Sequence, residues 1–235
     1  MPELVSCVMP TYNRPQYLPM ALRLFARQTW PNLEMIVVDD SEDESVHLPA
    51  GMTYNSPDGR IRVLRLADRA TIGTKLNIGI AAARGLIIQK WDDDDWYSPD
   101  FVSVMAPRAI GDPKAICALS DFLILTKERE LKYSGQGWAA GGTMCFHKSI
   151  WEQAKFRETS ESIADYDFFR DHPRAHRPVM VGPERYMLVR HEGAHRWQNI
   201  RGVKADDFFS SLRPYKKPLH GFLSAADLKF YQEVG

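Results

Sequence analysis

Short apolar runs that end abruptly in polar or proline residues constrain the fold of this chain more than any other feature. Leu4–Met9 is almost continuously apolar and ends at Pro10, and Leu33–Val38 ends in Asp39 and Asp40. Runs of this kind are typical of strands that are buried on both faces of a mostly parallel sheet. We therefore expect helices on both sides of such a sheet.

Stretches with helical periodicity lie between these runs. Tyr17–Phe25 carries apolar residues three and four positions apart, with Pro15 near its start, and Ile72–Arg84 repeats the pattern up to Gly85. Further strands are expected at Ile61–Leu66, Leu86–Ile88, Ala115–Leu119 and Phe122–Leu125, and further helices near Pro99, Ile150 and Asp165–Arg170. This alternation predicts an α/β fold with a mostly parallel sheet.

The size and the charge of the chain narrow the possibilities further. A chain of 235 residues with 44% hydrophobic residues can fill one sizeable core, so we expect one domain. Its 30 basic and 30 acidic residues cancel, which excludes a global field that would draw the protein onto nucleic acid or an anionic membrane. Any contact with a polyanion has to be local.

The cysteines and the N-terminus indicate a cytoplasmic protein. Cys7, Cys117 and Cys145 are far apart in apolar stretches, as expected of reduced thiols in a core. The first residues form no signal peptide, and no apolar run is long enough to span a membrane. Apolar residues of the tail between Phe222 and Tyr231 could touch a membrane surface, although packing on their own domain is the simpler interpretation.

Four consecutive aspartates, Asp92 to Asp95, follow the strand expected at Leu86–Ile88. Such carboxylates repel one another, and their desolvation is costly unless a cation compensates, so we predict a divalent metal ion here. A solvated acidic loop is the alternative, but the flanking aromatic residues indicate a partly enclosed site; these are Trp91, Trp96 and Tyr97. The spacing excludes an EF-hand. Because ligands of open α/β sheets bind beyond the carboxyl ends of strands, this cluster and Asp39/Asp40 are expected to face one cleft.

Four ordered motifs resemble those of one enzyme family. They are VSCVMPTYNRP at Val5–Pro15, IVVDDS ending at Ser41, IGTKLNIGIAAARG at Ile72–Gly85 and WDDDDWYSP at Trp91–Pro99. The chain thereby resembles, from residue 4 to about residue 197, the large family-two glycosyltransferases, which are inverting, nucleotide-sugar-dependent enzymes. The resemblance implies a GT-A fold, a Rossmann-like sheet sandwiched by helices with a smaller acceptor-side subregion. It also implies a nucleotide-sugar half at 1–110, an acceptor half at 111–200 and a tail at 201–235.

The resemblance further implies how the donor is held. Mn²⁺ or Mg²⁺ is expected on Asp92 and Asp94, with Asp94 the direct ligand, and His191 is the expected histidine, with His195 in reserve. The residues expected to bind the nucleotide sugar, most simply a UDP-sugar, are Pro10, Thr11, Tyr12, Arg14, Asp40, Lys75, Asn77, Asp92 and Asp93. Strand-end packing is an equal interpretation for Pro10 and Tyr12, as is a solvated surface position for Lys75.

Asp165 is the expected base that takes a proton from the acceptor hydroxyl. The family shows Glu-Asp here, whereas this chain has Ala164 before Asp165, so Asp167 and Glu161 stay open as alternatives. A helix N-cap is the structural alternative for Asp165. The expected acceptor-side residues are Trp96, Gly142 and Thr143, although plain turn chemistry also explains the glycine.

The acceptor itself stays open: a glycan, a lipid-linked molecule or another hydroxyl compound. Local basic patches, Arg174–Arg177 and Arg213–Lys217, are either solvated surface or contacts for a polyanion such as modified DNA. A nucleotidyltransferase would need a glycine-rich phosphate loop, which PTYNRP is not. The absent glutamate before Asp165 also permits a non-catalytic module that binds sugars or nucleotides.

Overall fold

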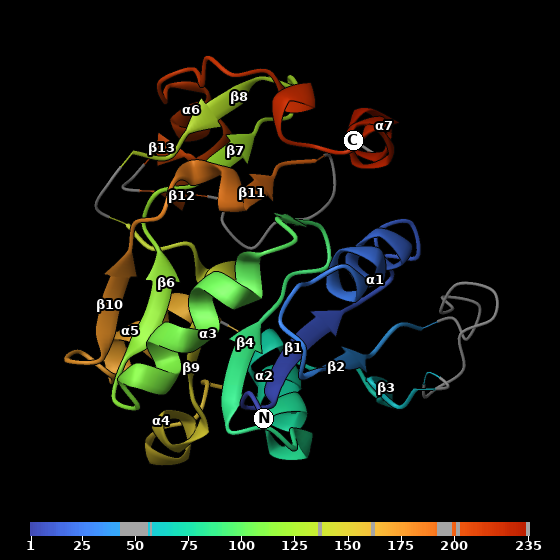
Figure 1. Ribbon diagram of the computed structural model, residues 1–235, viewed down its shortest axis with the longest axis vertical. Coiled ribbons are helices and arrows are strands. Elements are labelled where there is room, and N and C mark those ends of the chain that lie inside the picture. Colours follow the sequence, from blue (N-terminus) through green and yellow to red (C-terminus); the bar gives the residue numbers. More distant parts are fainter. Residues whose placement is uncertain are drawn as a thin grey trace.

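The computed structural model describes residues 1–42, 56, 58–135, 138–160, 163–191, 199–200 and 203–233. Its main element is a seven-stranded sheet in the order β10-β6-β9-β4-β1-β2-β3, in the lower part of Figure 1. The strands are β1 (Val5–Thr11), β2 (Leu33–Asp39), β3 (Ile61–Arg65), β4 (Ile87–Lys90), β6 (Ile116–Leu119), β9 (Cys145–His147) and β10 (His176–Val179). The sheet takes strands from both of the halves defined in the sequence.

The register of β1 brings the polar strand ends together. β1 pairs in parallel with β2, where Thr11 lies opposite Asp39, and with β4, where Val8 lies opposite Lys90. β9 runs antiparallel to its neighbours β4 and β6. Because parallel strands end at the same edge, the residues after β1, β2 and β4 meet there. The predicted α/β class with a mostly parallel sheet is confirmed.

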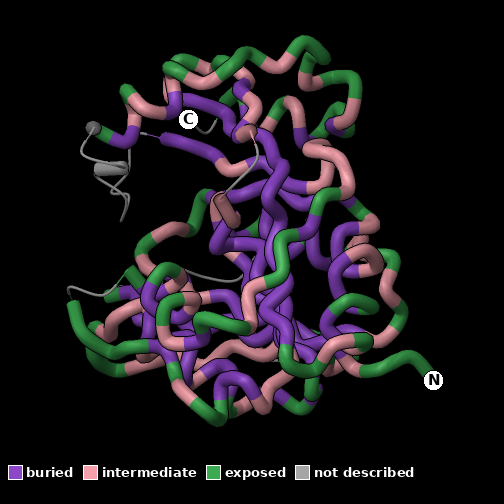
Figure 2. The backbone as a smooth tube through the Cα atoms, turned by 90° about the vertical axis from the view of Figure 1, so that its left-hand side faces the viewer, coloured by how far each residue is buried: buried purple, intermediate pink, exposed green. Residues whose placement is uncertain are grey.

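Helices cover both faces of the sheet. One hydrophobic cluster joins α1 (Leu18–Ala26) and α3 (Phe101–Gly111) to one face, and a second joins α2 (Ile72–Ala82), α4 (Lys148–Gln153) and α5 (Ala164–Asp171) to the other. The strands between them form the buried centre of the tube in Figure 2. α2 lies close to the sheet, since a Cβ on Gly79 would come within 2.4 Å of Val8 Cγ1.

The ends of α2 depend on side chains. Thr71 caps its N-terminus by accepting a hydrogen bond of 3.1 Å from the Thr74 amide. The helix ends at Ala82, two residues before the predicted Arg84. The reason is tertiary: the Arg84 amide and side chain both donate to the buried carboxylate of Glu34, at 2.7 Å each, and Ala83 is extended.

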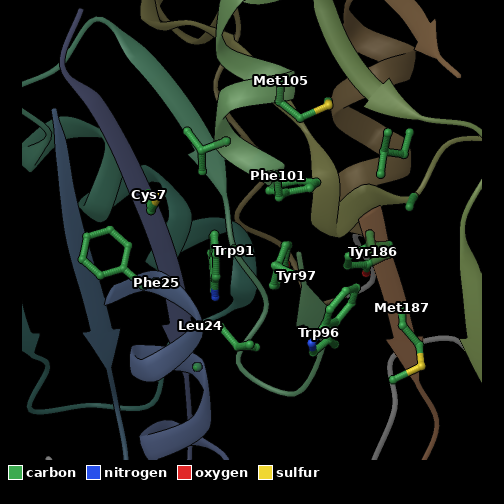
Figure 3. Packing of buried hydrophobic residues seen from close by; sticks show 14 of the residues in the cluster. Cys7, Leu24, Phe25, Trp91, Trp96, Tyr97, Phe101, Met105, Tyr186 and Met187 are labelled. Carbon is green, nitrogen blue, oxygen red and sulfur yellow. The ribbon is translucent and has the colours of Figure 1, made fainter. Parts of the chain in front are cut away.

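The aromatic residues around the aspartates build a core of their own. Trp91 stacks on Tyr97 with ring centroids 3.8 Å apart, and both rings pack edge to face on Phe101 (Figure 3). Trp96 and Tyr97 form β5, which pairs with β11 (Tyr186–Val189) in a second sheet of order β5-β11-β7-β8. β7 is Leu123–Leu125 and β8 is Leu131–Tyr133.

The C-terminal part of the chain packs on this second sheet and on α1. It contains β12 (Asn199–Ile200), β13 (Val203–Lys204), α6 (Ala205–Ser210) and α7 (Ala225–Glu233). Asp227 of α7 is almost fully buried and lies 2.6 Å from Arg27, the residue that caps the C-terminus of α1. Tyr231 donates to the Asp95 carbonyl at 3.0 Å. The preferred interpretation of the tail, packing on its own domain, is confirmed.

Two further expectations concern thiols and membranes. Cys7, Cys117 and Cys145 are buried and unbridged, as predicted. In the part of the chain that the structure describes, no helix combines the length and the apolar character needed to cross a bilayer.

Candidate functional site

A cavity of about 950 Å³ opens at the edge where β1 and β4 end. Its wall contains residues of both halves, from the strand ends, from the start of α2 and from α5 and β11. The predicted site residues that line it are Pro10, Thr11, Tyr12, Arg14, Lys75, Asp92, Asp93, Asp94, Gly142, Asp165 and His191. Neither Asp39 nor Asp40 lines this cavity: Asp39 is paired with Arg65, and Asp40 is linked to the cavity wall through Arg69 and Lys75. The two acidic segments thus lie at the same edge of the sheet, but the expectation that both face the cleft is not met.

The four aspartates are paired within the protein, so they do not form a solvated acidic loop. Lys90 Nζ lies 2.5 Å from Asp92 Oδ1, and Arg14 bridges Asp93 at 2.7 Å and Asp94 at 2.8 Å. Asp95 is fully buried and accepts from the Tyr186 hydroxyl and the Val189 amide. The sequence argument that such a cluster requires a metal ion is thus too strong, because Lys90 and Arg14 already offset part of the charge.

The electrostatics of the cluster still favour cations. The pKa of Asp92 is raised to about 6, chiefly by burial; the nearby Asp165 also raises it, and Lys90 partly offsets this. Burial also raises the pKa of Asp93 and Asp95. These carboxylates are costly to ionise in the free protein, so a ligand that brings positive charge is bound favourably.

Asp94 and His191 are the pair best suited to hold such an ion. Asp94 Oδ2 and His191 Nε2 lie 3.0 Å apart, close to the separation of adjacent ligands around an octahedral ion with bonds of about 2.1 Å. A carboxylate oxygen with an imidazole nitrogen suits Mn²⁺. Arg14 donates to the same oxygen, so an arriving ion competes with its guanidinium. Among the described residues no three acidic, histidine or cysteine side chains form a complete metal site, which leaves room for a ligand to supply the rest.

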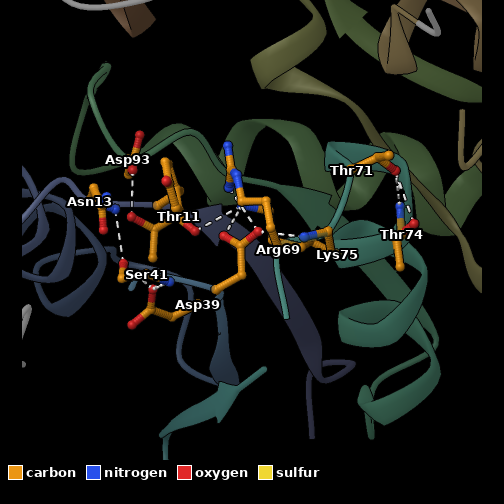
Figure 4. A network of polar contacts seen from close by, with 12 residues as sticks. Thr11, Asn13, Asp39, Ser41, Arg69, Thr71, Thr74, Lys75 and Asp93 are labelled. Carbon is orange, nitrogen blue, oxygen red and sulfur yellow. Dashed lines mark hydrogen bonds and ion pairs between the residues drawn. The ribbon is translucent and has the colours of Figure 1, made fainter. Parts of the chain in front are cut away.

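A second group of polar contacts surrounds Asp40 and includes Thr11, Arg69 and Lys75 of the cavity wall, which Figure 4 shows. The buried Asp40 carboxylate accepts from Lys75 and from Arg69, at 2.7 Å each, and from the Ala70 amide at 2.8 Å. Lys75 also donates to the Thr11 carbonyl at 2.9 Å. These bonds outweigh the effect of burial and lower the pKa of Asp40. Lys75 is therefore a buried partner of Asp40, and its interpretation as a solvated surface residue is wrong.

Tyr12 offers a flat, accessible surface beside Asp40. The guanidinium of Arg69 lies 3.2 Å from the centroid of its ring, and its hydroxyl donates to Glu42 at 2.8 Å. Strand-end packing alone therefore does not account for Tyr12, whose half-buried side chain lines the cavity. A stacked aromatic and guanidinium pair of this kind can hold a planar ring of a ligand.

Asp165 lines the same cavity, beside Lys90 and Asp92. It belongs to the first turn of α5, whose N-cap is Ile163, so the interpretation of Asp165 as the cap is wrong. Its Oδ1 is buried, 3.4 Å from Lys90 Nζ, and has no hydrogen-bond partner among the described residues. Asp167, a candidate base in the sequence, does not line the cavity and lies 2.6 Å from Arg170. Glu161, also a candidate base, and His195, the reserve histidine, lie outside the described residues.

Three predicted site residues point into the core instead of the cavity. Asn77 accepts from the Trp151 indole at 2.8 Å and donates to the Phe156 carbonyl. Thr143 is fully buried and accepts from the Leu119 amide, and Trp96 donates to Asp227 at 3.1 Å. The prediction that these three residues line the ligand site is therefore wrong. Spacing along the sequence could not show this, since these side chains satisfy polar groups buried in the core.

Three residues that line the cavity were not predicted from the sequence. Arg69 follows β3 on a loop, Tyr186 opens β11 and Lys90 ends β4. Lys90 carried a usable signal, because a lysine at the end of a buried strand directly before aspartates needs a partner. Arg69 and Tyr186 are brought to the site by tertiary contacts alone.

The chain is similar in sequence to proteins of one known family. The family model described as glycosyl transferase family 2 matches residues 6–168. Glycosyltransferase GlyG of Streptococcus pneumoniae is 33% identical over 106 residues, which cover 45% of this chain and 35% of GlyG.

Solved structures share the fold. S. aureus TarS 1–349 in complex with UDP-GlcNAc matches with a TM-score of 0.61 and 20% identity, over 82% of this chain and 60% of that chain. The mannosyltransferase PcManGT from Pyrobaculum calidifontis, in complex with GDP-Man and Mn²⁺, matches with a TM-score of 0.60 and 16% identity, over 84% and 59%. The chain thus spans less than two thirds of the length of each of these relatives.

Proposed function

The chain belongs to glycosyl transferase family 2, and we propose that it transfers a sugar from a nucleoside diphosphate donor to an acceptor hydroxyl. The observation that carries the proposal is one cavity lined both by the groups that follow the parallel strands and by a carboxylate on α5. Such an arrangement can hold a donor and a reacting carboxylate together in one site.

The nucleoside end of the donor is proposed to lie on Tyr12 and Arg69. The ring of Tyr12 and the guanidinium of Arg69 give a stacking surface for a base, and Asp40 holds Arg69 in place. A UDP-sugar is the favoured donor, as the UDP-GlcNAc complex of the similar TarS supports. A GDP-sugar is the alternative donor, as the GDP-Man complex of PcManGT suggests, and a nucleotide screen has to distinguish it from a UDP-sugar.

The diphosphate is proposed to lie beside Asp92, Asp94 and His191, where Mn²⁺ or Mg²⁺ joins it. When bound, this ion supplies positive charge that stabilises the leaving nucleoside diphosphate, so that group needs no proton. Asp94 and His191 would hold the ion, and Arg14, which donates to the same Asp94 oxygen, would then be available to a phosphate oxygen. The Mn²⁺ in PcManGT supports this choice of ion.

Asp165 is proposed to act as the base. Its carboxylate takes the proton of the acceptor hydroxyl as the oxygen of that hydroxyl bonds to the anomeric carbon and the bond to the diphosphate breaks. Attack from the side opposite the leaving group inverts the anomeric configuration. The acceptor side of the cavity is lined by Gly142, Ile163 and Phe209, and it is open to a glycan, lipid-linked or other hydroxyl acceptor. The unbridged, buried cysteines support action in the cytoplasm.

Calorimetry with Mn²⁺ and a panel of nucleoside diphosphates tests the donor side. We expect binding of one nucleotide that requires the metal, and loss of that binding in Asp94→Ala. Asp112→Asn, on the exposed loop after α3, is the matched control and should bind like the wild-type protein. A folded wild-type protein that binds no nucleoside diphosphate with Mn²⁺ would contradict the proposal.

Transfer from the donor found in this way tests the base. Asp165→Asn should keep nucleotide binding and lose transfer by a factor of about 10² to 10⁴, the usual contribution of a general base. Transfer at the wild-type rate by Asp165→Asn would refute the assignment of the base. Binding without any transfer by the wild-type protein would instead favour the non-catalytic module.

A further inference from the structure

The buried ammonium group of Lys90 joins the two sides of the site. Lys90 is the last residue of β4 and only 4% exposed, and its amide donates to the Met144 carbonyl at 2.8 Å. Its Nζ lies 2.5 Å from Asp92 Oδ1 on the donor side and 3.4 Å from Asp165 Oδ1 on the acceptor side. No other cation is paired with Asp165 among the residues that the structure describes.

The opposite side of both carboxylates is closed by the 3₁₀ turn η1 (Gly141–Thr143). A Cβ on Gly141 would lie 2.0 Å from Asp165 Oδ2, and a Cβ on Gly142 would lie 2.5 Å from Asp92 Oδ2. Each carboxylate therefore rests against glycine backbone on one side and faces the same ammonium group on the other. Glycine is therefore needed at positions 141 and 142 because a side chain there would collide with Asp165 or Asp92, and not only because of the turn conformation.

We propose that Lys90 is a positioning residue, which fixes the carboxylate of Asp165 at a set distance and angle from Asp92. The inference rests on the proposed function, in which the two aspartates serve the acceptor and the donor. Without the ammonium, the two adjacent carboxylates repel each other and Asp165 turns away from Asp92. Since misplacement of a reacting group by about 1 Å can cost roughly 10²-fold in rate, the position of Asp165 has to be held from both sides.

A double-mutant cycle of Lys90→Met and Asp165→Asn tests this role. Methionine has a similar length and no charge, and Lys229→Met on the exposed face of α7 is the matched control. We expect Lys90→Met to lower kcat at least about tenfold, since the effect runs through the base. In the Asp165→Asn background the same substitution should change kcat less than about twofold.

The outcomes separate the possible errors. Equal loss of kcat in both backgrounds would mean that Lys90 acts independently of Asp165, which would overturn the proposal. A kcat of Lys90→Met within about twofold of the wild-type value would also overturn it. Absence of turnover by the wild-type protein with every donor would refute the proposed function itself. Thermal unfolding of each variant shows that it is folded; if Lys90→Met is not, Lys90→Gln, which keeps an N–H donor without the charge, takes its place under the same criteria.

Discussion

Replacement of Gly141 by alanine is the perturbation with the most specific expected result. The new Cβ would lie 2.0 Å from Asp165 Oδ2 and 2.4 Å from its Cγ, whereas ordinary contacts begin at 3.4 Å. The carboxylate therefore has to retreat by about 1.4 Å, or the turn has to move by a comparable amount. Such overpacking typically costs about 1–3 kcal/mol in stability.

The effect on turnover should be larger than the effect on stability. A displacement of about 1 Å at a reacting group can lower a rate about 10²-fold, so we expect kcat of Gly141→Ala to fall by roughly 10 to 100 times. Donor binding should stay within about threefold, because the clash is with Asp165 and not with the donor-binding groups. Initial rates of nucleotide release measure the first quantity, and calorimetry with the nucleoside diphosphate and Mn²⁺ measures the second.

Two other glycines serve as comparisons. A Cβ on Gly142 would meet Asp92 Oδ2 at 2.5 Å and the Tyr186 hydroxyl at 2.6 Å, so Gly142→Ala should weaken donor binding as well as turnover. A Cβ on Gly111, at the end of α3, meets nothing within 4 Å, so Gly111→Ala should behave like the wild-type protein. If Gly141→Ala keeps kcat within about twofold of wild type while Gly111→Ala also does, the placement of the base against this turn is refuted.

Three further outcomes are expected. Hydrogen bonds from Ser6 and Arg84 to buried Glu34 outweigh the effect of burial and lower its pKa. Glu34 therefore stabilises the fold above about pH 4.3, and this contribution is lost as the pH falls through the folded-state pKa. Tm should fall less between pH 5 and pH 3 in Glu34→Gln than in the wild-type protein, and equal falls would contradict this. Asp227→Ala should cost about 2–3 kcal/mol in urea unfolding, because it leaves Arg27 unpaired beside α7, and an unchanged midpoint would be inconsistent with the buried pair. Arg14→Met should bind Mn²⁺ alone more tightly by calorimetry, since it removes the guanidinium that competes for the Asp94 oxygen, and weaker binding would argue against competition there.

Much of the fold follows from local pattern. The apolar runs that became β1, β2 and β4 are each buried on both faces, and such runs have few alternatives in a chain that also has helical repeats between them. Element ends were less predictable, as α2 shows. Its last turn stops where Glu34, 50 residues earlier in the chain, takes the Arg84 amide.

The sequence by itself determined which residues meet at the end of the sheet. Parallel strands that close in aspartates bring those aspartates to one edge whatever the details of packing, so Asp40, Asp92 and Asp94 could be assigned to one edge of the sheet from spacing alone. The family resemblance added Asp165 and His191, and both line the same cavity.

Only the tertiary structure decided how the charges in that cleft are balanced. Whether a lysine such as Lys75 or Lys90 reaches solvent or a buried carboxylate depends on the distance between elements that are remote in the chain, and no periodicity encodes that distance. The same holds for Asn77, whose amide satisfies buried polar groups of another segment. The spacing of apolar residues along the sequence predicts helices and strands. The pairing of buried polar atoms depends instead on which segments lie close together in three dimensions.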